Sequence, residues 1–141
     1  MAREKFSLNK EKKGIYSELS QIFSEREKFP PAKQWEVYKF RTSPKDTERT
    51  EIMKSRPGII ISTNELNKWG QRYIFLPITS KKFNKVYPFE IFIDFQGKKG
   101  KALPDQIKTY SHGRIIKKYG TLDSKYYPII EKKLKEVFGW K

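Results

Sequence analysis

Short runs of apolar, mostly β-branched or aromatic residues follow one another from Trp35 to Thr109, separated by glycine, proline and polar residues. In the first run, Trp35 and Val37 fall on one face of an extended chain, and Tyr38 and Phe40 fall on the other. This alternation is the period of a β-strand. The pattern predicts five strands, at residues 35–41, 59–62, 72–78, 89–95 and 101–109. Runs this short cannot cross a bilayer as helices, so a small strand-rich domain is expected.

Two amphipathic helices are predicted near the ends of the chain. The N-terminal helix, which either covers the core or docks a partner, has its apolar face at Ile15, Leu19, Ile22 and Phe23. The C-terminal helix begins near Pro128, ends before Gly139, and has its apolar face at Ile130, Leu134, Val137 and Phe138. Short helices are also expected at residues 64–68 and 113–118.

The length of 141 residues suits one domain with one core. We expect residues 1–34 to form a helical extension and residues 35–141 to form the domain. Several strands followed by a terminal helix indicate an α+β fold. In such a fold a small, strongly bent sheet or barrel is closed by the C-terminal helix.

Basic residues outnumber acidic residues by 31 to 16, which gives a formal net charge of +15. A small domain with this excess attracts polyanions, so a nucleic acid is the first candidate partner and an acidic protein is the second. The chain has no cysteine and one histidine, His112. Disulfide scaffolds, thiolate zinc sites, cysteine nucleophiles and histidine-rich metal sites are therefore excluded. The charged N-terminus lacks the apolar stretch of a secretory signal, so a cytoplasmic location is expected.

A reaction on a nucleic acid without a metal or other cofactor is the chemistry that best suits this composition, and RNA cleavage can proceed in this way. The 2′-hydroxyl of RNA attacks its own adjacent phosphate, so the enzyme orients the groups, assists proton transfer and stabilises negative charge. An arginine fork matches phosphate oxygens, and a hydroxyl adds a hydrogen bond. Basic or hydroxyl-bearing strand ends occur at residues 54–58, 77–82 and 104–109. Taken singly, each is more typical of an ordinary polar strand end.

Four stretches carry a resemblance to a known family: KSRPGIIIST at 54–63, IFLPITSK at 74–81, ALPDQIKT at 102–109 and RIIKKYGTL at 114–122. Together with Glu36-Val37-Tyr38, and over residues 35–141, they resemble the MazF/PemK family of toxin endoribonucleases. The resemblance implies a small SH3-like β-barrel with a C-terminal helix, usually homodimeric. It also implies metal-independent, sequence-selective cleavage of single-stranded RNA, which inhibits translation, and an antitoxin whose acidic tail occupies the RNA groove.

The resemblance implies the site residues as well. The family's catalytic arginine before proline matches Arg56, and its strand-end threonine matches Thr79. In the PemK branch an arginine stands two positions before the acidic residue, but Leu103 stands there in this chain, so Arg56 with Thr79 is the expected catalytic pair. The residues expected to bind RNA are Lys54, Ser80, Lys81, Lys82, Asp105, Gln106 and Lys108.

Two departures from the family pattern lie on the RNA-facing side, so no target sequence is implied. Residues 47–55 (TERTEIMKS) replace the usual glycine-rich loop, and Trp35 replaces the glycine that often opens the first strand. Tyr38, Phe83 and Tyr87 are candidates for stacking unpaired bases, although each is individually more typical of core packing.

Two other functions are open from the sequence. Related CcdB-type barrels bind gyrase and do not cut RNA, and a barrel of this charge can bind nucleic acid without catalysis. Arg56 with Thr79 distinguishes the ribonuclease, because the RNA mechanism needs this pair and gyrase binding does not.

Overall fold

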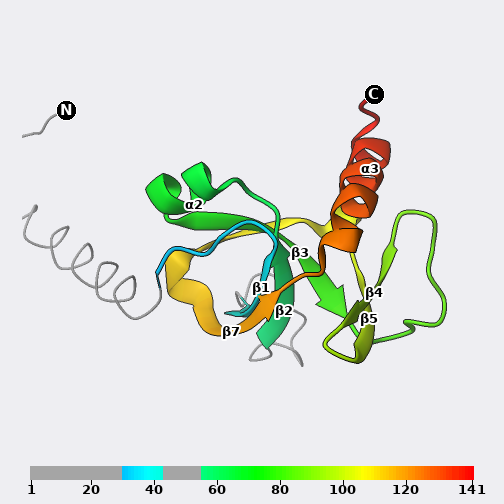
Figure 1. The fold of residues 1–141 in the computed structure, drawn as a ribbon, viewed down its shortest axis with the longest axis horizontal. Coiled ribbons are helices and arrows are strands. Elements are labelled where there is room, and N and C mark those ends of the chain that lie inside the picture. The colour runs from blue at the N-terminus through cyan, green and yellow to red at the C-terminus, as the bar shows by residue number, and fades with distance from the viewer. Residues whose placement is uncertain (1–29, 43–54) are drawn as a thin grey trace, which may run out of the picture.

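A computed structural model describes residues 30–42 and 55–141 of the chain. Within these residues one antiparallel sheet has the strand order β4-β5-β3-β2-β1-β7, and β6 pairs with β3 (Figure 1). The strands are β1 (Glu36–Arg41), β2 (Ser55–Ile60), β3 (Arg72–Thr79), β4 (Ile91–Phe95), β5 (Lys98–Ala102), β6 (Lys108–Ser111) and β7 (Ile115–Thr121). The helices are α2 (Asn64–Gly70) and α3 (Tyr127–Phe138), with single 3-10 turns η3 (Pro104–Gln106), η4 (His112–Arg114) and η5 (Ser124–Tyr126).

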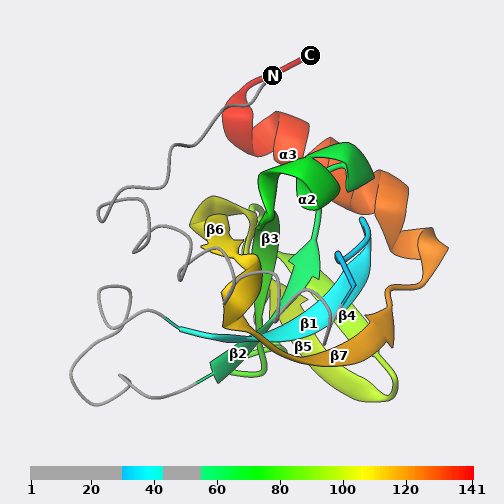
Figure 2. The same cartoon turned by 90° about the vertical axis from the view of Figure 1, so that its left-hand side faces the viewer.

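The central strands bury both of their faces, because their side chains alternate between two cores. The first core lies between the sheet and α3 and contains Val37, Ile59, Leu76, Ile93 and Ile130, among others. Figure 2 shows α3 lying across one side of the curled sheet. The expected α+β fold, a small bent barrel closed by a C-terminal helix, is confirmed.

The second core is built mainly from aromatic rings on the opposite face of the central strands. Phe40 and Phe75 stack with their centroids 4.2 Å apart, and Tyr110 meets Phe75 edge-on at 5.2 Å. Tyr73 is fully buried in the same cluster. Aromatic rings of this size bury much apolar area each, so a chain with few aliphatic residues still fills its core.

Trp35 opens β1 in the left-handed backbone region, with φ of 74°. This conformation favours glycine and costs other residues about 1–3 kcal/mol. The Trp35 N–H donates to the Ile60 carbonyl at 2.7 Å, and the Trp35 carbonyl accepts from the Leu122 N–H at 2.8 Å. The indole also stacks on Tyr127 at 4.2 Å. These contacts offset the cost and join β1, β2 and the start of the C-terminal helix.

The strand predicted at 101–109 is wrong as a single element. β5 ends at Ala102, η3 follows, and β6 begins only at Lys108. Pro104 explains the break, because proline has no N–H for the ladder. The turn before β5 is also shorter than the gap between the strands predicted at 89–95 and 101–109, since it covers only Gln96 and Gly97. Gln96 and Gly97 adopt positive φ there, so Lys98 and its neighbours belong to β5.

The short helix predicted at 113–118 is also wrong, because this segment forms η4 and most of β7. β7 pairs with β1 in an antiparallel ladder that brings Tyr38 opposite Lys118, and Ile115 enters the aromatic core. The hydrogen bonds of β7 are formed with the edge of β1, and no local pattern in the sequence predicts this pairing. The strand predicted at 59–62 likewise begins earlier, at Ser55.

Both helices of the described region agree with the sequence pattern. Thr63 caps α2 by accepting a hydrogen bond from the Leu66 N–H at 3.2 Å. Gly139 ends α3 with φ of 71°, and a proline lies in its first turn. The helix predicted around Ile15 to Phe23 lies outside the described residues. Among the residues that the structure describes, no helix is long and apolar enough to cross a membrane.

Gly58 is required by the close packing of β2 on the aromatic core. A Cβ at this position would overlap the Phe75 ring, with Phe75 Cε2 2.8 Å away. We expect Gly58→Ala to lower the free energy of unfolding by about 1–3 kcal/mol, because overpacking displaces a buried ring. Denaturant titration measures the loss. Gly113→Ala is the matched control, since the nearest atom to its Cβ is Ser111 Oγ at 4.0 Å. Equal stability of the two variants would contradict this packing argument.

Candidate active site

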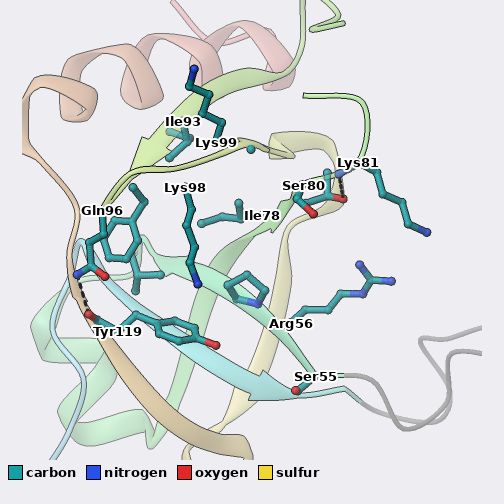
Figure 3. Close-up of a pocket in the computed structure, with 15 residues that line it drawn as sticks. Ser55, Arg56, Ile78, Ser80, Lys81, Ile93, Gln96, Lys98, Lys99 and Tyr119 are labelled. Atoms are coloured by element: carbon teal, nitrogen blue, oxygen red, sulfur yellow. Dashed lines mark hydrogen bonds between the residues drawn. The ribbon is translucent and has the colours of Figure 1, made fainter. Parts of the chain in front are cut away.

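The register between β2 and β3 brings two distant parts of the sequence together. Gly58 lies opposite Pro77, and Ile59 lies opposite Leu76. Continuing this antiparallel register for two more residues places Arg56 opposite Thr79, the last residue of β3. Both residues line the same pocket, whose volume is about 360 Å³. The two residues of the sequence-predicted catalytic pair therefore meet in one pocket, in which Figure 3 labels Arg56.

The pocket combines a basic rim with an apolar floor. Arg56, Lys81, Lys98 and Lys99 supply four cations, and none of the described residues lining the pocket is acidic. The floor and walls include Val37, Ile78, Ile93 and Phe95. Cations in a concave, partly apolar site interact more strongly with an anion than they would in open water. The pocket is thus suited to an anionic ligand that also carries an apolar part.

Thr79 is held with its hydroxyl oriented by the turn that follows β3. Its Oγ1 accepts a hydrogen bond from the Lys81 N–H at 3.1 Å. A hydroxyl that accepts in this way keeps its own proton available to donate. The geometry therefore provides one hydrogen-bond donor on the β3 side of the pocket, facing the strand that carries Arg56.

A buried lysine anchors the loop that leaves this turn. Lys101, which is 5% exposed, lies opposite Thr79 in the β3–β5 ladder. Its Nζ donates to Glu90 Oε1 at 2.7 Å and to the Lys85 carbonyl at 3.0 Å. Burial acts to raise the pKa of Glu90, but the Lys101 hydrogen bond and charge, with the Tyr87 amide, hold that pKa below its usual value. These contacts hold Lys85, in the middle of the loop, and Glu90, near its end, against β5.

The other sequence-predicted site residues are not all gathered in the pocket. Ser80 and Lys81 line it beside Arg56 and Thr79, whereas the neighbouring Lys82 does not. The remaining predicted RNA-binding residues of the described region lie outside the pocket: Asp105 and Gln106 are exposed in η3, and Lys108 is half-buried in β6. Lys54 lies outside the described residues.

Sequence reasoning missed four pocket residues, Gln96, Lys98, Lys99 and Tyr119. The first three fall between the strands predicted at 89–95 and 101–109. Tyr119 directly follows the segment predicted to be helical at 113–118. The Gln96-Gly97 pair resembles a two-residue hairpin turn, which would have suggested that the next strand begins at Lys98. No local signal places Tyr119, because its position depends on the pairing of β7 with β1.

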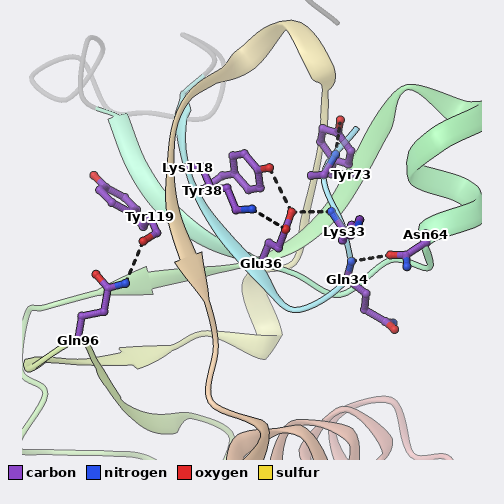
Figure 4. A network of polar contacts seen from close by, with 10 residues as sticks. Lys33, Gln34, Glu36, Tyr38, Asn64, Tyr73, Gln96, Lys118 and Tyr119 are labelled. Atoms are coloured by element: carbon purple, nitrogen blue, oxygen red, sulfur yellow. Dashed lines mark hydrogen bonds and ion pairs between the residues drawn. The ribbon is translucent and has the colours of Figure 1, made fainter. Parts of the chain in front are cut away.

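Tyr38 is not available to stack a base, which agrees with the core packing that is more typical of each such aromatic residue. It is 3% exposed, and its hydroxyl donates to Glu36 Oε1 at 3.1 Å (Figure 4). Burial and the Glu36 charge raise the pKa of Tyr38. Burial also acts to raise the pKa of Glu36. The Lys118 ammonium, whose Nζ lies 2.8 Å from Glu36 Oε2, lowers this pKa together with the Lys33 amide and the Tyr38 hydroxyl. Tyr38 therefore belongs to a buried polar network.

The other two stacking candidates, Phe83 and Tyr87, are 37% and 44% exposed. They belong to the loop between β3 and β4 and do not line the pocket. Within the described part of the chain, histidine and acidic side chains form no group of three or more that could hold a metal ion.

Comparison with known proteins gives consistent matches. A family model described as "PemK-like, MazF-like toxin of type II toxin-antitoxin system" matches residues 33–138. The endoribonuclease toxin MazF of Escherichia coli K12 is 29% identical over 94 residues, which span 66% of this chain and 83% of the relative.

Solved structures share the fold. An endoribonuclease in complex with its cognate antitoxin, from a mycobacterial species, superposes with a TM-score of 0.65 and 15% identity, covering 78% of this chain and 97% of that one. MazF from Deinococcus radiodurans superposes with a TM-score of 0.64 and 20% identity, covering 77% and 97%.

Proposed function

Because this chain belongs to the PemK-like, MazF-like toxin family of type II toxin–antitoxin systems, we propose that it cleaves single-stranded messenger RNA in the cytoplasm, at selected sequences and without a metal ion. Cleavage of messenger RNA would inhibit translation. The observation that carries the proposal is that Arg56 and Thr79 line one pocket, in which the charged residues among the described lining are all basic. A curated relative with 29% identity is an endoribonuclease, which supports the same chemistry.

In the proposed reaction the 2′-oxygen of one nucleotide attacks its own 3′-phosphorus. A bond forms between the 2′-oxygen and phosphorus, and the bond from phosphorus to the 5′-oxygen of the next nucleotide breaks. The 2′-hydroxyl loses its proton, and the departing 5′-oxygen gains one. The products carry a 2′,3′-cyclic phosphate and a 5′-hydroxyl. DNA lacks the attacking hydroxyl and is not a substrate.

Arg56 and Thr79 have distinct parts in this reaction. The Arg56 guanidinium binds the two non-bridging phosphate oxygens and stabilises the charge that grows on them. The Thr79 hydroxyl donates a hydrogen bond to the same phosphate, since its oxygen is already oriented by the Lys81 amide. Lys81, Lys98 and Lys99 attract the RNA backbone through its negative charge.

The first test is incubation of the purified protein with a long RNA and a DNA of matching sequence, both in EDTA. We expect the RNA to be cut into fragments with 5′-hydroxyl ends and the DNA to stay intact. Loss of cleavage in EDTA and recovery with magnesium would show that metal independence is wrong. RNA bound but uncut would indicate a binding barrel. Neither binding nor cleavage of RNA would favour a gyrase-binding toxin.

The second test removes the guanidinium. Arg56→Ala is expected to slow single-turnover cleavage by roughly 10²–10³-fold, the usual effect of losing one preorganised charge-stabilising group. RNA affinity should fall much less, because the neighbouring lysines supply most of the phosphate attraction. Arg56→Lys should restore little, since lysine has no planar fork.

Arg72→Ala is the matched control for this test, because Arg72 lies at the opposite end of β3 from Thr79 and is exposed. It should cut RNA at the wild-type rate. Thermal melting checks that all three variants are folded. A folded Arg56→Ala protein that cuts RNA normally would remove Arg56 from the mechanism.

We also propose that the chain works as a homodimer that an acidic antitoxin inhibits. The net charge of +15 favours an acidic partner. Five large apolar side chains in the stretch from Phe83 to Phe92 are each more than a third exposed, and exposed apolar patches commonly mark protein contacts. A solved structure with 15% identity is an endoribonuclease bound to its cognate antitoxin. Sedimentation of the purified protein at micromolar concentration should give twice the chain mass, and a single-chain mass would contradict the dimer.

A further inference from the structure

One side of the pocket has features that phosphate binding does not require. A phosphate is recognised by cations and hydrogen-bond donors, and Arg56, Thr79 and Lys81 supply these on one side. Figure 3 shows Tyr119 and Lys98 on the opposite side from Ser80 and Lys81. The floor between them is apolar and includes Val37, Ile78, Ile93 and Phe95. This apolar surface supplies neither the charge nor the hydrogen-bond donors that recognise an anion.

Tyr119 is held on the pocket wall by the turn between β4 and β5. The Gln96 side-chain amide donates to the Tyr119 carbonyl at 2.9 Å (Figure 4). The next residue, Gly120, has φ of 145°, and a Cβ there would lie 2.7 Å from Gln96 Nε2. The missing side chain at Gly120 therefore lets Gln96 lie against the β7 backbone. As a result, the Tyr119 backbone is held beside the pocket by the turn between β4 and β5 as well as by the pairing of β7 with β1.

The Tyr119 ring has the surroundings of a stacking surface. It is partly buried and packs against the aliphatic core beneath the pocket. Lys117 Nζ lies 5.7 Å from its ring centroid, so one positive charge stands close to the ring. Lys98 contributes a second cation to the same pocket. An aromatic ring flanked by lysines is the combination that single-stranded nucleic-acid sites use, with the ring for a base and the cations for the backbone.

We propose that Tyr119 and the apolar floor form a nucleobase subsite, in which one unpaired RNA base next to the cleaved phosphate stacks on the Tyr119 ring. The inference rests on the proposed function, since it assigns a second part of the same RNA site. With the base seated at Tyr119, its own phosphate extends toward Arg56 and Thr79, and Lys98 binds the adjoining backbone. Holding both base and phosphate limits the rotations of the nucleotide and so aligns the 2′-hydroxyl for attack. A base-paired nucleotide cannot enter this subsite, which favours single strands.

The test measures base-dependent binding without relying on cleavage. The probes are four 2′-O-methyl homopolymers, one for each base, and an abasic oligomer of equal length and charge. None of these can be cut by attack of a 2′-hydroxyl. For the wild-type chain we expect at least one homopolymer to bind about 10- to 100-fold more tightly than the abasic oligomer, as one stacked base allows.

Tyr119→Leu should lose most of this excess while keeping its affinity for the abasic oligomer, because the lysines are unchanged. Tyr119→Phe should keep the excess, since the ring is retained. Trp69→Leu is the control for loss of an exposed aromatic ring, because Trp69 is 74% exposed on α2 and does not line the pocket. It should keep the wild-type excess. A Tyr119→Leu protein that keeps the full excess, or a wild-type chain with none, would overturn the subsite.

A measurement on the wild-type chain covers the case in which Tyr119→Leu fails to fold. The ring-proton NMR signals of Tyr119 should shift on adding the favoured homopolymer and stay in place with the abasic oligomer. Unmoved signals at saturation would equally overturn the proposal. RNA cleavage by the same preparation is followed in parallel. Cleavage without base-dependent effects at Tyr119 would refute the subsite alone, whereas absence of cleavage would refute the proposed function.

Discussion

The antiparallel register between β2 and β3 is the constraint on which the rest of this structure depends. Gly58 can approach the Phe75 ring only because it has no side chain, and this contact helps to fix the pairing of Gly58 with Pro77. A slip of one residue would exchange the two faces of each strand and move Ile59 out of its core. The same register brings Arg56 opposite Thr79. Core packing and the geometry of the site therefore have a single cause.

Among the described residues, some lysines have a structural role and other cations line the pocket. Two lysines are paired with carboxylates in or near the core, Lys101 with Glu90 and Lys118 with Glu36, and both acids have a lowered pKa. Charge pairs of this kind tie a loop or strand in place. The pocket differs, since its described lining residues include four cations and no acid. A concave site whose charged residues, among those described, are all cations attracts a polyanion over a long range, and more strongly at low salt. This arrangement agrees with a toxin family that acts on RNA.

The proposed division of the pocket also accounts for its shape. If phosphate binding were its only purpose, an exposed cluster of basic side chains would suffice. The apolar floor and the fixed Tyr119 ring instead make a nucleotide, with its base and its phosphate, the unit that the pocket fits. Selectivity among RNA sequences then depends on the shape of the base subsite, while affinity depends mainly on charge. Trp35, one of the departures of this chain from the family pattern, adopts the left-handed region at the start of β1, where its indole stacks on Tyr127.

The sequence by itself determined the helices capped by Thr63 and Gly139 and the aromatic character of the core, because local spacing, capping residues and composition carry this information. Short motifs also predicted Arg56 and Thr79 as site residues, and the structure places both in one pocket. The five-strand prediction failed where Pro104 interrupts a run and where β7 replaces an expected helix, since strand pairing there depends on the edge of β1. Only the tertiary structure shows that Lys98, Gln96 and Tyr119 line the pocket. It also shows that Tyr38 is buried in a polar network. The physical reason is that a sheet joins residues by hydrogen bonds between strands far apart in the chain, and no local pattern records which strands will meet.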